Sequence, residues 1–287
     1  MKWENLREEE FAPMLEKTHR VCAVGIGCIE KHGQHLPLGA DTMQVRKIVS
    51  LAAEREPVCE FPALFFGDLQ GAHQFDPVHG KGHYGFVAFS AELLLQILHE
   101  LCDEIGRNGF DKIVFVNGHG GNQAMLSNFV RAMRYEKKPY KVFSCFNKLV
   151  TPPILLDMIA KNGRESLPLL TDEDVAILQE YVDQGGYGGH ACFSESGMML
   201  GTEPEFVRMD RCDVDSGLTT HRADFLVEAG IDYGSWWNLN YPNSFHGTSP
   251  RKLTQTIADT MVSVAVDNLA KKFAVLRDDE KMAALDH

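Results

Sequence analysis

The sequence predicts an α/β protein of three layers, in which a mainly parallel sheet is covered by helices on both faces. In the first half of the chain, short runs rich in Val, Ile and Phe alternate with stretches whose apolar residues recur at helical spacing. Such alternation is typical of βαβ units, whose crossover helices cover a parallel sheet. Loops rich in glycine and histidine directly follow two of the expected strands, which is where ligands bind in such sheets.

Four short apolar runs are expected to form the strands: residues 20–29, 58–68, 111–117 and 141–147. The expected helices cover residues 42–56, 91–105 behind a Ser90 N-cap, and 123–135. A long amphipathic helix near the C-terminus is expected to have Ser249 as its cap and Pro250 in its first turn. Residues 149–187 break the rhythm, and we interpret them as an excursion or lid within a single domain of residues 1–287.

Composition narrows the class of protein. The 287 residues are 44% hydrophobic, enough for a substantial core, and the net charge of −12 argues against nucleic acid or an anionic membrane as the main partner. The chain lacks an apolar run of about 18 residues and starts with polar residues, so we expect neither a membrane span nor a secretory signal. The seven cysteines are irregularly spaced without a C-x-x-C pair, which argues against a disulfide scaffold and a zinc site built from thiolates. We expect a cytoplasmic protein.

Two polar clusters follow expected strands. The stretch "CIEKHGQHLPLGAD" follows the first strand and carries Glu30, His32 and Asp41, while "NGHGGN" follows the third and carries His119. Both loops should open on one edge of the sheet, so these side chains should converge. Converging carboxylates repel unless cations lie between them, and carboxylate and imidazole ligands suit Zn²⁺, Mn²⁺ or Fe²⁺. The pattern therefore favours a metal site over the alternative of two solvated loops.

Asp41 has a special position in this set. It stands at the start of a helix, where negative charge is favoured, and its two oxygens could bridge two ions. Two cations about 3.5–4 Å apart can share a hydroxide and polarise a substrate carbonyl. His35 is the weaker candidate nearby, since it either orients a ligand or packs against Leu36.

Two further loops carry candidate residues. The glycine-rich segment 185–200 contains His190 and Glu195 and runs into an apolar helix. The loop 67–85 is long and lacks periodicity, which favours a functional role, although its histidines could equally be exposed. The candidates for substrate contact are His73, His79, His83 and Asn117.

Three motifs, in order, resemble those of the creatininase (creatinine amidohydrolase) family over about residues 20–270: "EKHGQHLPLGAD", "VNGHGGN" and "HACFSESGMML". The resemblance implies a three-layer fold with a two-metal site, in which Glu30, Asp41 and His119 hold one ion. It implies that His32 and the bridging Asp41 hold the other, and that His190 carries protons. It also implies a cytoplasmic homo-oligomer, with creatininase itself being a hexamer.

The resemblance breaks at two positions that concern the second ion. Creatininase has a glutamate two residues after the histidine that matches His119, where this chain has Gly121. Other members have a glutamate three residues after the match to His190, where this chain has Phe193. The second ion is therefore short of a carboxylate unless Glu195 supplies it.

A tryptophan that closes over creatinine in creatininase has no counterpart in residues 149–187. Trp236 and Trp237 lie elsewhere in the sequence. This difference argues against creatinine itself as the substrate.

The sequence thus predicts a metal-dependent hydrolase of a small polar cyclic substrate, acting on a cyclic amide C–N bond by attack of metal-bound hydroxide. His190 and Glu195 are its candidate catalytic residues. The expected cofactor is one or two divalent ions per subunit, with zinc ahead of manganese and iron. One alternative is hydrolysis of a C–C bond in an oxidised cyclic polyol of the diketo-inositol type, as in some relatives. A catalytically silent, metal-stabilised oligomer is the other.

Overall fold

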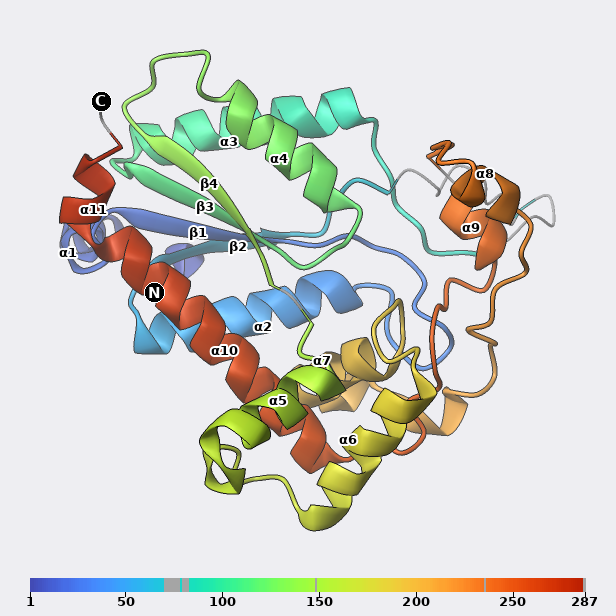
Figure 1. The fold of residues 1–287 in the computed structure, drawn as a ribbon. Coiled ribbons are helices and arrows are strands. Elements are labelled where there is room, and N and C mark those ends of the chain that lie inside the picture. Colours follow the sequence, from blue (N-terminus) through green and yellow to red (C-terminus); the bar gives the residue numbers. More distant parts are fainter. Residues whose placement is uncertain (70–77, 79–82, 148, 235, 286–287) are drawn as a thin grey trace.

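A computed structural model describes residues 1–69, 78, 83–147, 149–234 and 236–285. Within these residues, four parallel strands form a sheet in the order β2-β1-β3-β4 (Figure 1). The strands are β1 (Val21–Ile26), β2 (Cys59–Leu64), β3 (Lys112–Asn117) and β4 (Lys141–Phe146). Each lies within an expected run, so the α/β fold with a parallel sheet is confirmed.

The two central strands are buried along their whole length, because helices cover both of their faces. β1 and β3 pair in register, from Val21 opposite Lys112 to Ile26 opposite Asn117. The two strands therefore end at the same level, and the loops that follow them start side by side.

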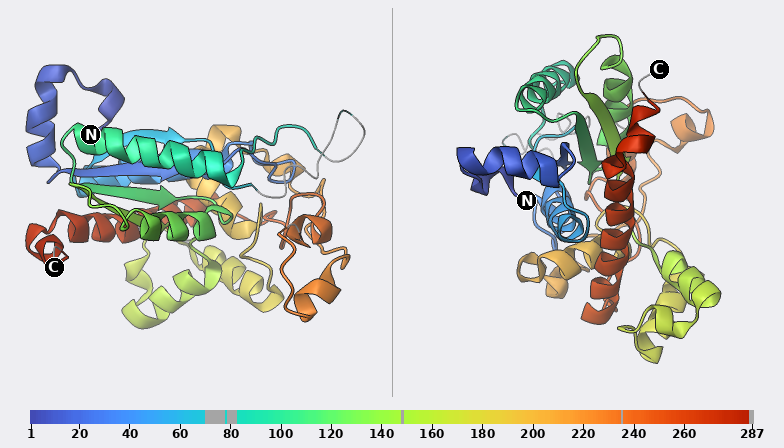
Figure 2. Two further views of the ribbon diagram at one scale, coloured as in Figure 1. Left: turned by 90° about the horizontal axis from the view of Figure 1, so that it is seen from above. Right: turned by 90° about the vertical axis from the view of Figure 1, so that its left-hand side faces the viewer.

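Helices form a layer on each face of the sheet (Figures 1 and 2). One layer contains α3 (Ala91–Arg107) and α4 (Asn122–Ala132), and the other contains α2 (Ala40–Arg55) and α10 (Gln255–Arg277). Alternate residues of β1 enter two separate cores, as its pleat requires. Val21 and Ala23 pack on the α2 and α10 side, whereas Cys22 and Val24 pack on the α3 side.

The cap expected for α3 is present, since Ser90 accepts a hydrogen bond from the backbone nitrogen of Leu93. The start expected for the C-terminal helix is wrong. Thr254 caps α10 by accepting a hydrogen bond from the backbone nitrogen of Ile257. The hydroxyl of Ser249 instead donates to Asp213 Oδ1 at 2.5 Å, and Pro250 precedes the helix.

The remaining helices lie around this sandwich. They are α1 (Glu8–Lys17), α5 (Pro152–Asn162), α6 (Asp172–Gln184), α7 (Phe193–Thr202), α8 (Asp224–Glu228), α9 (Trp236–Asn240) and α11 (Asp279–Ala283). α5 and α6 occupy the expected excursion, and their Leu155, Leu178 and Tyr181 are buried in the same core as α10. α8 and α9 lie together on the right of Figure 1, beyond the ends of the strands.

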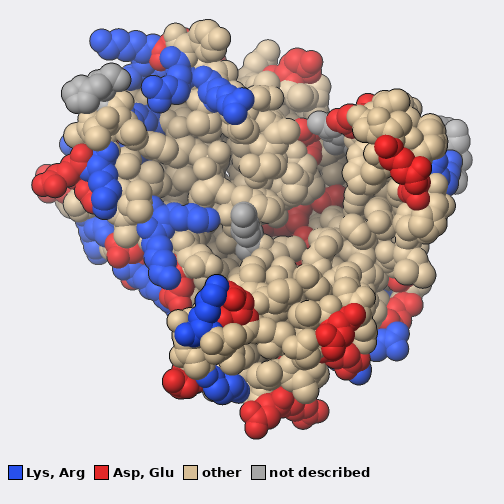
Figure 3. All heavy atoms as spheres, in the orientation of Figure 1, with Lys and Arg blue, Asp and Glu red and all other residues tan. Residues whose placement is uncertain are grey.

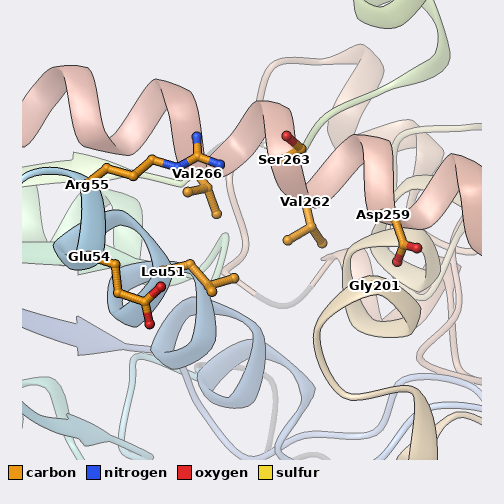
Figure 4. Close-up of a pocket in the computed structure, with 8 residues that line it drawn as sticks. All are labelled: Leu51, Glu54, Arg55, Gly201, Asp259, Val262, Ser263 and Val266. Atoms are coloured by element: carbon orange, nitrogen blue, oxygen red, sulfur yellow. The ribbon is translucent and has the colours of Figure 1, made fainter. Parts of the chain in front are cut away.

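A pocket of about 240 Å³ lies between α2 and α10 (Figure 4). Its walls are partly aliphatic, and its ionisable residues are Glu54, Arg55 and Asp259. None of these residues is among the catalytic, metal-binding or substrate-binding candidates that the sequence predicts. In the described part of the chain, no helix combines the length and apolar character that a membrane crossing requires.

Candidate active site

Gly27 lets the loop after β1 close against the start of α2. A Cβ at this position would lie 2.5 Å from Thr42 Oγ1 and closer still to the Thr42 backbone nitrogen, so a larger residue would not fit. The loop turns back so that the backbone nitrogen of Glu30 donates to the carbonyl of Leu38 at 2.9 Å. Asp41, in the first turn of α2, is thereby brought beside the end of β1.

Two asparagines hold the loop after β3. Asn117 Oδ1 accepts hydrogen bonds from the backbone nitrogen of His119 at 3.0 Å and from Asn122 Nδ2 at 3.1 Å. Asn122 Nδ2 also donates to the carbonyl of Gly27 at 3.2 Å, which ties this loop to the loop after β1. The expectation that both loops open on one edge of the sheet is confirmed. The buried side chain of Asn117, the last residue of β3, holds this loop in shape.

Asp41 lies between two histidines. Its Oδ1 is 3.2 Å from His32 Nε2, and its Oδ2 is 2.8 Å from His119 Nδ1. Glu30 Oε1 approaches the same nitrogen of His119 at 3.0 Å. Glu195 Oε1 lies 3.7 Å from His32 Nε2. Glu195 and the four residues of the first two motifs therefore form one buried cluster with Asp41 at its centre.

Three histidines of the site each direct one ring nitrogen at a backbone carbonyl. The pairs are His32 Nδ1 with Glu30 at 3.2 Å, His119 Nε2 with Asp68 at 3.1 Å, and His190 Nε2 with Lys31 at 2.8 Å. Because a carbonyl only accepts hydrogen bonds, we assign the ring proton to these nitrogens. In the neutral form of each ring, the other nitrogen would face the carboxylates with a lone pair, which is how metal-binding histidines are held.

Burial and charge oppose each other in this cluster. Burial disfavours the charged form of His32, but the carboxylates of Glu195 and Asp41 outweigh it and raise the pKa of His32 well above its usual value. Burial also disfavours the charged form of His119, but the carboxylates of Glu30 and Asp41 outweigh it and raise the pKa of His119 well above its usual value. Burial would raise the pKa of Asp41, but the charges of His32 and His119 hold it well below its usual value. The carboxylates thus require positive charge beside them, which bound cations would also supply.

His190 and Trp237 form the neighbouring side of the site. The His190 ring stacks on His32 with centroids 4.1 Å apart, and its Nδ1 is 3.9 Å from both Glu30 Oε1 and Glu195 Oε2. Trp237 of α9 meets the His190 ring edge-on at 5.1 Å. Although Trp237 is far from the other motifs in sequence, the fold places it at the site.

The contact with Trp237 depends on a non-local pairing that no local pattern predicts. The backbones of His190 and His246 exchange hydrogen bonds of 2.9 and 2.8 Å, which brings the chain after α9 against the His190 loop. Tyr241 stacks on His246 and also contacts Trp237. The aromatic cluster in "SWWNLNYPNSF" is the signal that could have drawn attention to this segment.

The loop 67–85 carries three histidines that are candidates for substrate contact. His83 Nε2 lies 2.7 Å from the carbonyl of Pro242, in the segment that follows Trp237. His73 and His79 lie outside the described residues.

His35 is buried beside the cluster and contacts Ser196 Oγ through its Nε2 at 2.9 Å. Burial, together with the charge of His32, lowers the pKa of His35 to about 4. A neutral His35 therefore braces the loop after β1 against α7.

Two residues of the first motif have contacts that its pattern did not suggest. Cys28 Sγ lies 3.1 Å from Asp41 Oδ2, inside the cluster. Lys31 is buried, and its Nζ lies 2.5 Å from Asp215 Oδ2 and 2.6 Å from the carbonyl of Asn243. The hydrogen bond to Asn243 ties the loop after β1 to the segment that follows Trp237, and the ion pair ties it to Asp215.

Charged side chains are unevenly distributed over the face shown in Figure 3. Acidic atoms line the floor of a hollow between the main body and the part that carries α8 and α9, whereas Lys and Arg gather mainly on the opposite side of this face. The hollow opens beyond the ends of the strands, which is where ligands bind in parallel sheets.

A family model described as creatininase, creatinine amidohydrolase, matches residues 4–273. The chain belongs to the creatininase family. Members of this family are metal-dependent amidohydrolases, and this creatininase-family chain is an enzyme of that class. The family resemblance expected from the three motifs is confirmed.

Two curated relatives differ in what they act on. The chain is 33% identical over 197 residues to the mycofactocin precursor peptide peptidase of Mycolicibacterium smegmatis, covering 61% of this chain and 72% of that protein. It is 22% identical over 208 residues to the creatinine amidohydrolase of Pseudomonas putida, covering 71% and 72%. The crystal structure of creatinine amidohydrolase (creatininase) superposes with a TM-score of 0.67 at 18% identity, over 96% of this chain and 98% of that one. The structural likeness supports the three-layer fold.

The cluster fits a divalent metal ion. Solved creatininase structures include forms described as Zn-Zn and Mn, both with a TM-score of 0.65. In this chain, the buried Glu30 Oε1 accepts no hydrogen bond from the described residues. Overlapping groups of carboxylate, imidazole and thiol atoms lie within 4.8 Å of one another. The donor types and the unpartnered oxygen are those that a divalent cation would satisfy.

The two departures from the family motifs have a physical explanation. A Cβ at Gly121 would lie 2.5 Å from His119 Nε2 and closer still to the carbonyl oxygen of Asp68, so the observed position of His119 excludes a glutamate there. Phe193 is fully buried and packs against Tyr181, away from the cluster. Two residues further along α7, on the opposite side of the helix, Glu195 points to His32.

Proposed function

We propose that the chain hydrolyses an amide C–N bond with two divalent ions. The proposed ligands are Glu30, Asp41 and His119 for one ion, and His32, Asp41 and Glu195 for the other. The observation that carries the proposal is the position of Asp41, whose two oxygens face different histidines at 3.2 and 2.8 Å. When bound, such ions lower the pKa of water and polarise a carbonyl oxygen.

His190 is the proposed proton carrier. Its Nε2–H is held by the carbonyl of Lys31, so Nδ1 is the nitrogen that can accept a proton and pass it on. Glu30 Oε1 and Glu195 Oε2 each lie 3.9 Å from this nitrogen. As the C–N bond breaks, the carbonyl carbon gains the hydroxyl of water, and the leaving nitrogen gains the proton from His190.

A small polar cyclic amide is the proposed substrate class. Trp237 lies next to His190 and is flanked by Tyr241, with 5.5 Å between the two ring centroids. An aromatic side of this kind suits a flat ring, which can pack on the indole while its carbonyl points to the carboxylate cluster. The relative that is named a creatinine amidohydrolase supports this class.

A peptide amide is a second candidate, supported by the relative that is named a peptide peptidase. The segment around α8 exposes apolar side chains that a peptide could cover. The side chains that are more than half exposed include Leu218, Phe225, Ile231 and Tyr233. The bond broken would be the same, so only the substrate panel distinguishes the two candidates.

The test is an activity screen of the metal-stripped protein before and after it is reloaded with Zn²⁺ or Mn²⁺. The panel contains creatinine and other lactams, short peptides, and oxidised cyclic polyols. Metal-dependent release of an amino group from a lactam or a peptide is the expected result. If only the polyols are hydrolysed, the enzyme breaks a C–C bond and the proposed hydrolysis of an amide C–N bond is wrong. Metal binding without turnover of any compound would favour a silent oligomer.

A further inference from the structure

We propose that Cys28 is a fourth protein ligand of the ion held by Glu30, Asp41 and His119, so that the two ions have different surroundings. The inference rests on the proposed function, since it concerns the same metal site. It adds a sulfur donor to a site whose other donors are carboxylates and imidazoles.

The position of the sulfur supports ligation. Cys28 is fully buried, and its Sγ lies 3.1 Å from Asp41 Oδ2, the oxygen that faces His119. Donor atoms of Cys28, Glu30, Asp41 and His119 all lie within 4.8 Å of one another. Ligands at about 2.0–2.3 Å from a tetrahedral zinc ion are about 3.3–3.8 Å apart, so these atoms need only small movements to surround one ion.

Glu30 supplies a second observation. Its Oε1 is buried and lacks a hydrogen-bond donor among the described residues, yet it lies 3.0 Å from His119 Nδ1. An unpartnered carboxylate oxygen in a buried site is costly, and a cation would remove that cost. A cation held by these donor atoms would satisfy Oε1, and the Cys28 sulfur is one of the atoms in that group.

The other cysteines have different surroundings. Cys22, Cys59 and Cys102 lie in the apolar core on the α3 side of the sheet. Cys192 Sγ donates to the backbone carbonyl of Tyr187 at 3.0 Å. As a mere hydrogen-bond donor to Asp41, the thiol of Cys28 would be weak, whereas as a ligand its proton is released and the sulfur binds the ion.

Ligation by Cys28 would give the two ions different roles, one structural and one open to water. Four protein donors complete a tetrahedral shell, which is typical of a structural site, whereas three donors leave a position for water. The ion held by His32, Asp41 and Glu195 would then be the one open to water, on the side where His190 lies. A sulfur donor also favours Zn²⁺ over Mn²⁺ at the Cys28 site, while the harder donors of the other site discriminate less.

The test is a Co²⁺ titration of the metal-stripped protein, followed by absorption spectroscopy. We expect a sulfur-to-cobalt charge-transfer band in the near ultraviolet for the wild type and for the control Cys145→Ser, which changes a cysteine of β4. The band should be lost in Cys28→Ser. This variant should also bind Zn²⁺ about 10–100-fold more weakly and lose its preference for Zn²⁺ over Mn²⁺.

The wild-type spectrum decides the matter even if Cys28→Ser does not fold. Co²⁺ d–d bands without a charge-transfer band would overturn ligation by Cys28 and leave the proposed function standing. A protein that binds no Co²⁺ would overturn both. A charge-transfer band that survives in Cys28→Ser would assign the sulfur to another residue and would equally refute the proposal.

Discussion

The two sides of the candidate site are built in different ways. Glu30, His32, Asp41 and His119 stand at the ends of β1 and β3 or in the first turn of α2, and all four are buried. His190 and Trp237 lie in segments far apart in sequence, which are joined by the pairing of residues 190 and 246 and by hydrogen bonds of Thr248 to Gly185 and Gly186. The strand side is held by a continuous hydrogen-bonded sheet, whereas the loop side is held by a few separate contacts.

This difference suggests a division of labour. Rigid elements hold groups more precisely than loops do, and metal ligands need that precision. Loops on a fixed scaffold are where substrate contacts commonly vary. We therefore expect changes on the strand side to affect the metals, and changes on the loop side to affect substrate binding and proton transfer.

The largest effect is expected from Asp41→Asn, because Asp41 is proposed to bind both ions. Activity and metal affinity should each fall by at least about 100-fold, since even the partners of metal ligands contribute about 10–100-fold. The metal content of the purified variant, measured by plasma emission spectroscopy, checks this. A variant with full metal content and full activity would show that Asp41 does not bridge.

Glu195→Gln should affect one ion and leave the other. We expect the affinity of the weaker metal site to fall by about 10–100-fold, while the ion at Glu30, Asp41 and His119 stays bound. Calorimetric titration with Zn²⁺ measures both events. Glu203→Gln, which changes a carboxylate next to the far end of α7, is the matched control and should bind both ions as the wild type does. If Glu195→Gln and Glu203→Gln bind Zn²⁺ with the same affinities, Glu195 is not a metal ligand.

Adjacent tryptophans allow a sharp test of the loop side. Trp237→Ala should lower kcat/KM by about 10-fold, equivalent to about 1.4 kcal/mol, through loss of its contact with His190 and substrate. Metal content should not change. Trp236→Ala is the control and should keep nearly full kcat/KM. If both variants behave alike, the contact with His190 has no special role.

Asp174 lies outside both sides and should affect stability alone. It accepts hydrogen bonds from Thr171, Thr254 and Thr256, which joins the start of α6 to the start of α10. Asp174→Asn should lower the free energy of unfolding by about 2 kcal/mol at pH 7, as expected for lost hydrogen bonds to a charged group. Thermal unfolding measures the change, and the activity of the folded variant should be that of the wild type.

The stabilisation by Asp174 should depend on pH in a defined direction. Burial would raise the pKa of Asp174, but the hydroxyl of Thr254 and the groups of Thr171 and Thr256 lower it below its usual value. A carboxyl group with a lowered pKa stabilises the fold above its unfolded-state pKa of about 4, and this stabilisation is lost as the pH falls through the lower folded-state value. The difference in unfolding temperature between wild type and Asp174→Asn should therefore shrink below about pH 4. A constant difference would contradict this assignment.

The strand side could be predicted from the sequence because its signals are local. A buried strand that ends in Glu30 and His32, and another that ends near His119, place these residues at one sheet edge once the parallel sheet is assumed. Asp41 could be placed because it starts the next helix.

The loop side could not be predicted, because it depends on contacts between distant segments. Trp237 lies beside His190 because non-local contacts, among them the pairing of residues 190 and 246, hold their two segments together. The start of α10 differs from the expected one for a related reason, since the hydroxyl of Ser249 donates to Asp213 and Thr254 caps the helix. In the sequence, Cys28 stands among apolar neighbours and resembles a core residue. Its contact with Asp41 Oδ2 is visible only in the structure.

The most direct test of the central claim is an anomalous diffraction experiment at the zinc edge on crystals of the zinc-loaded protein. We expect two peaks at the ends of β1 and β3, one between Glu30, Asp41 and His119, and one between His32, Asp41 and Glu195. Asp41 should contact both. Peaks elsewhere, or a single peak that Asp41 does not contact, would contradict the two-ion site.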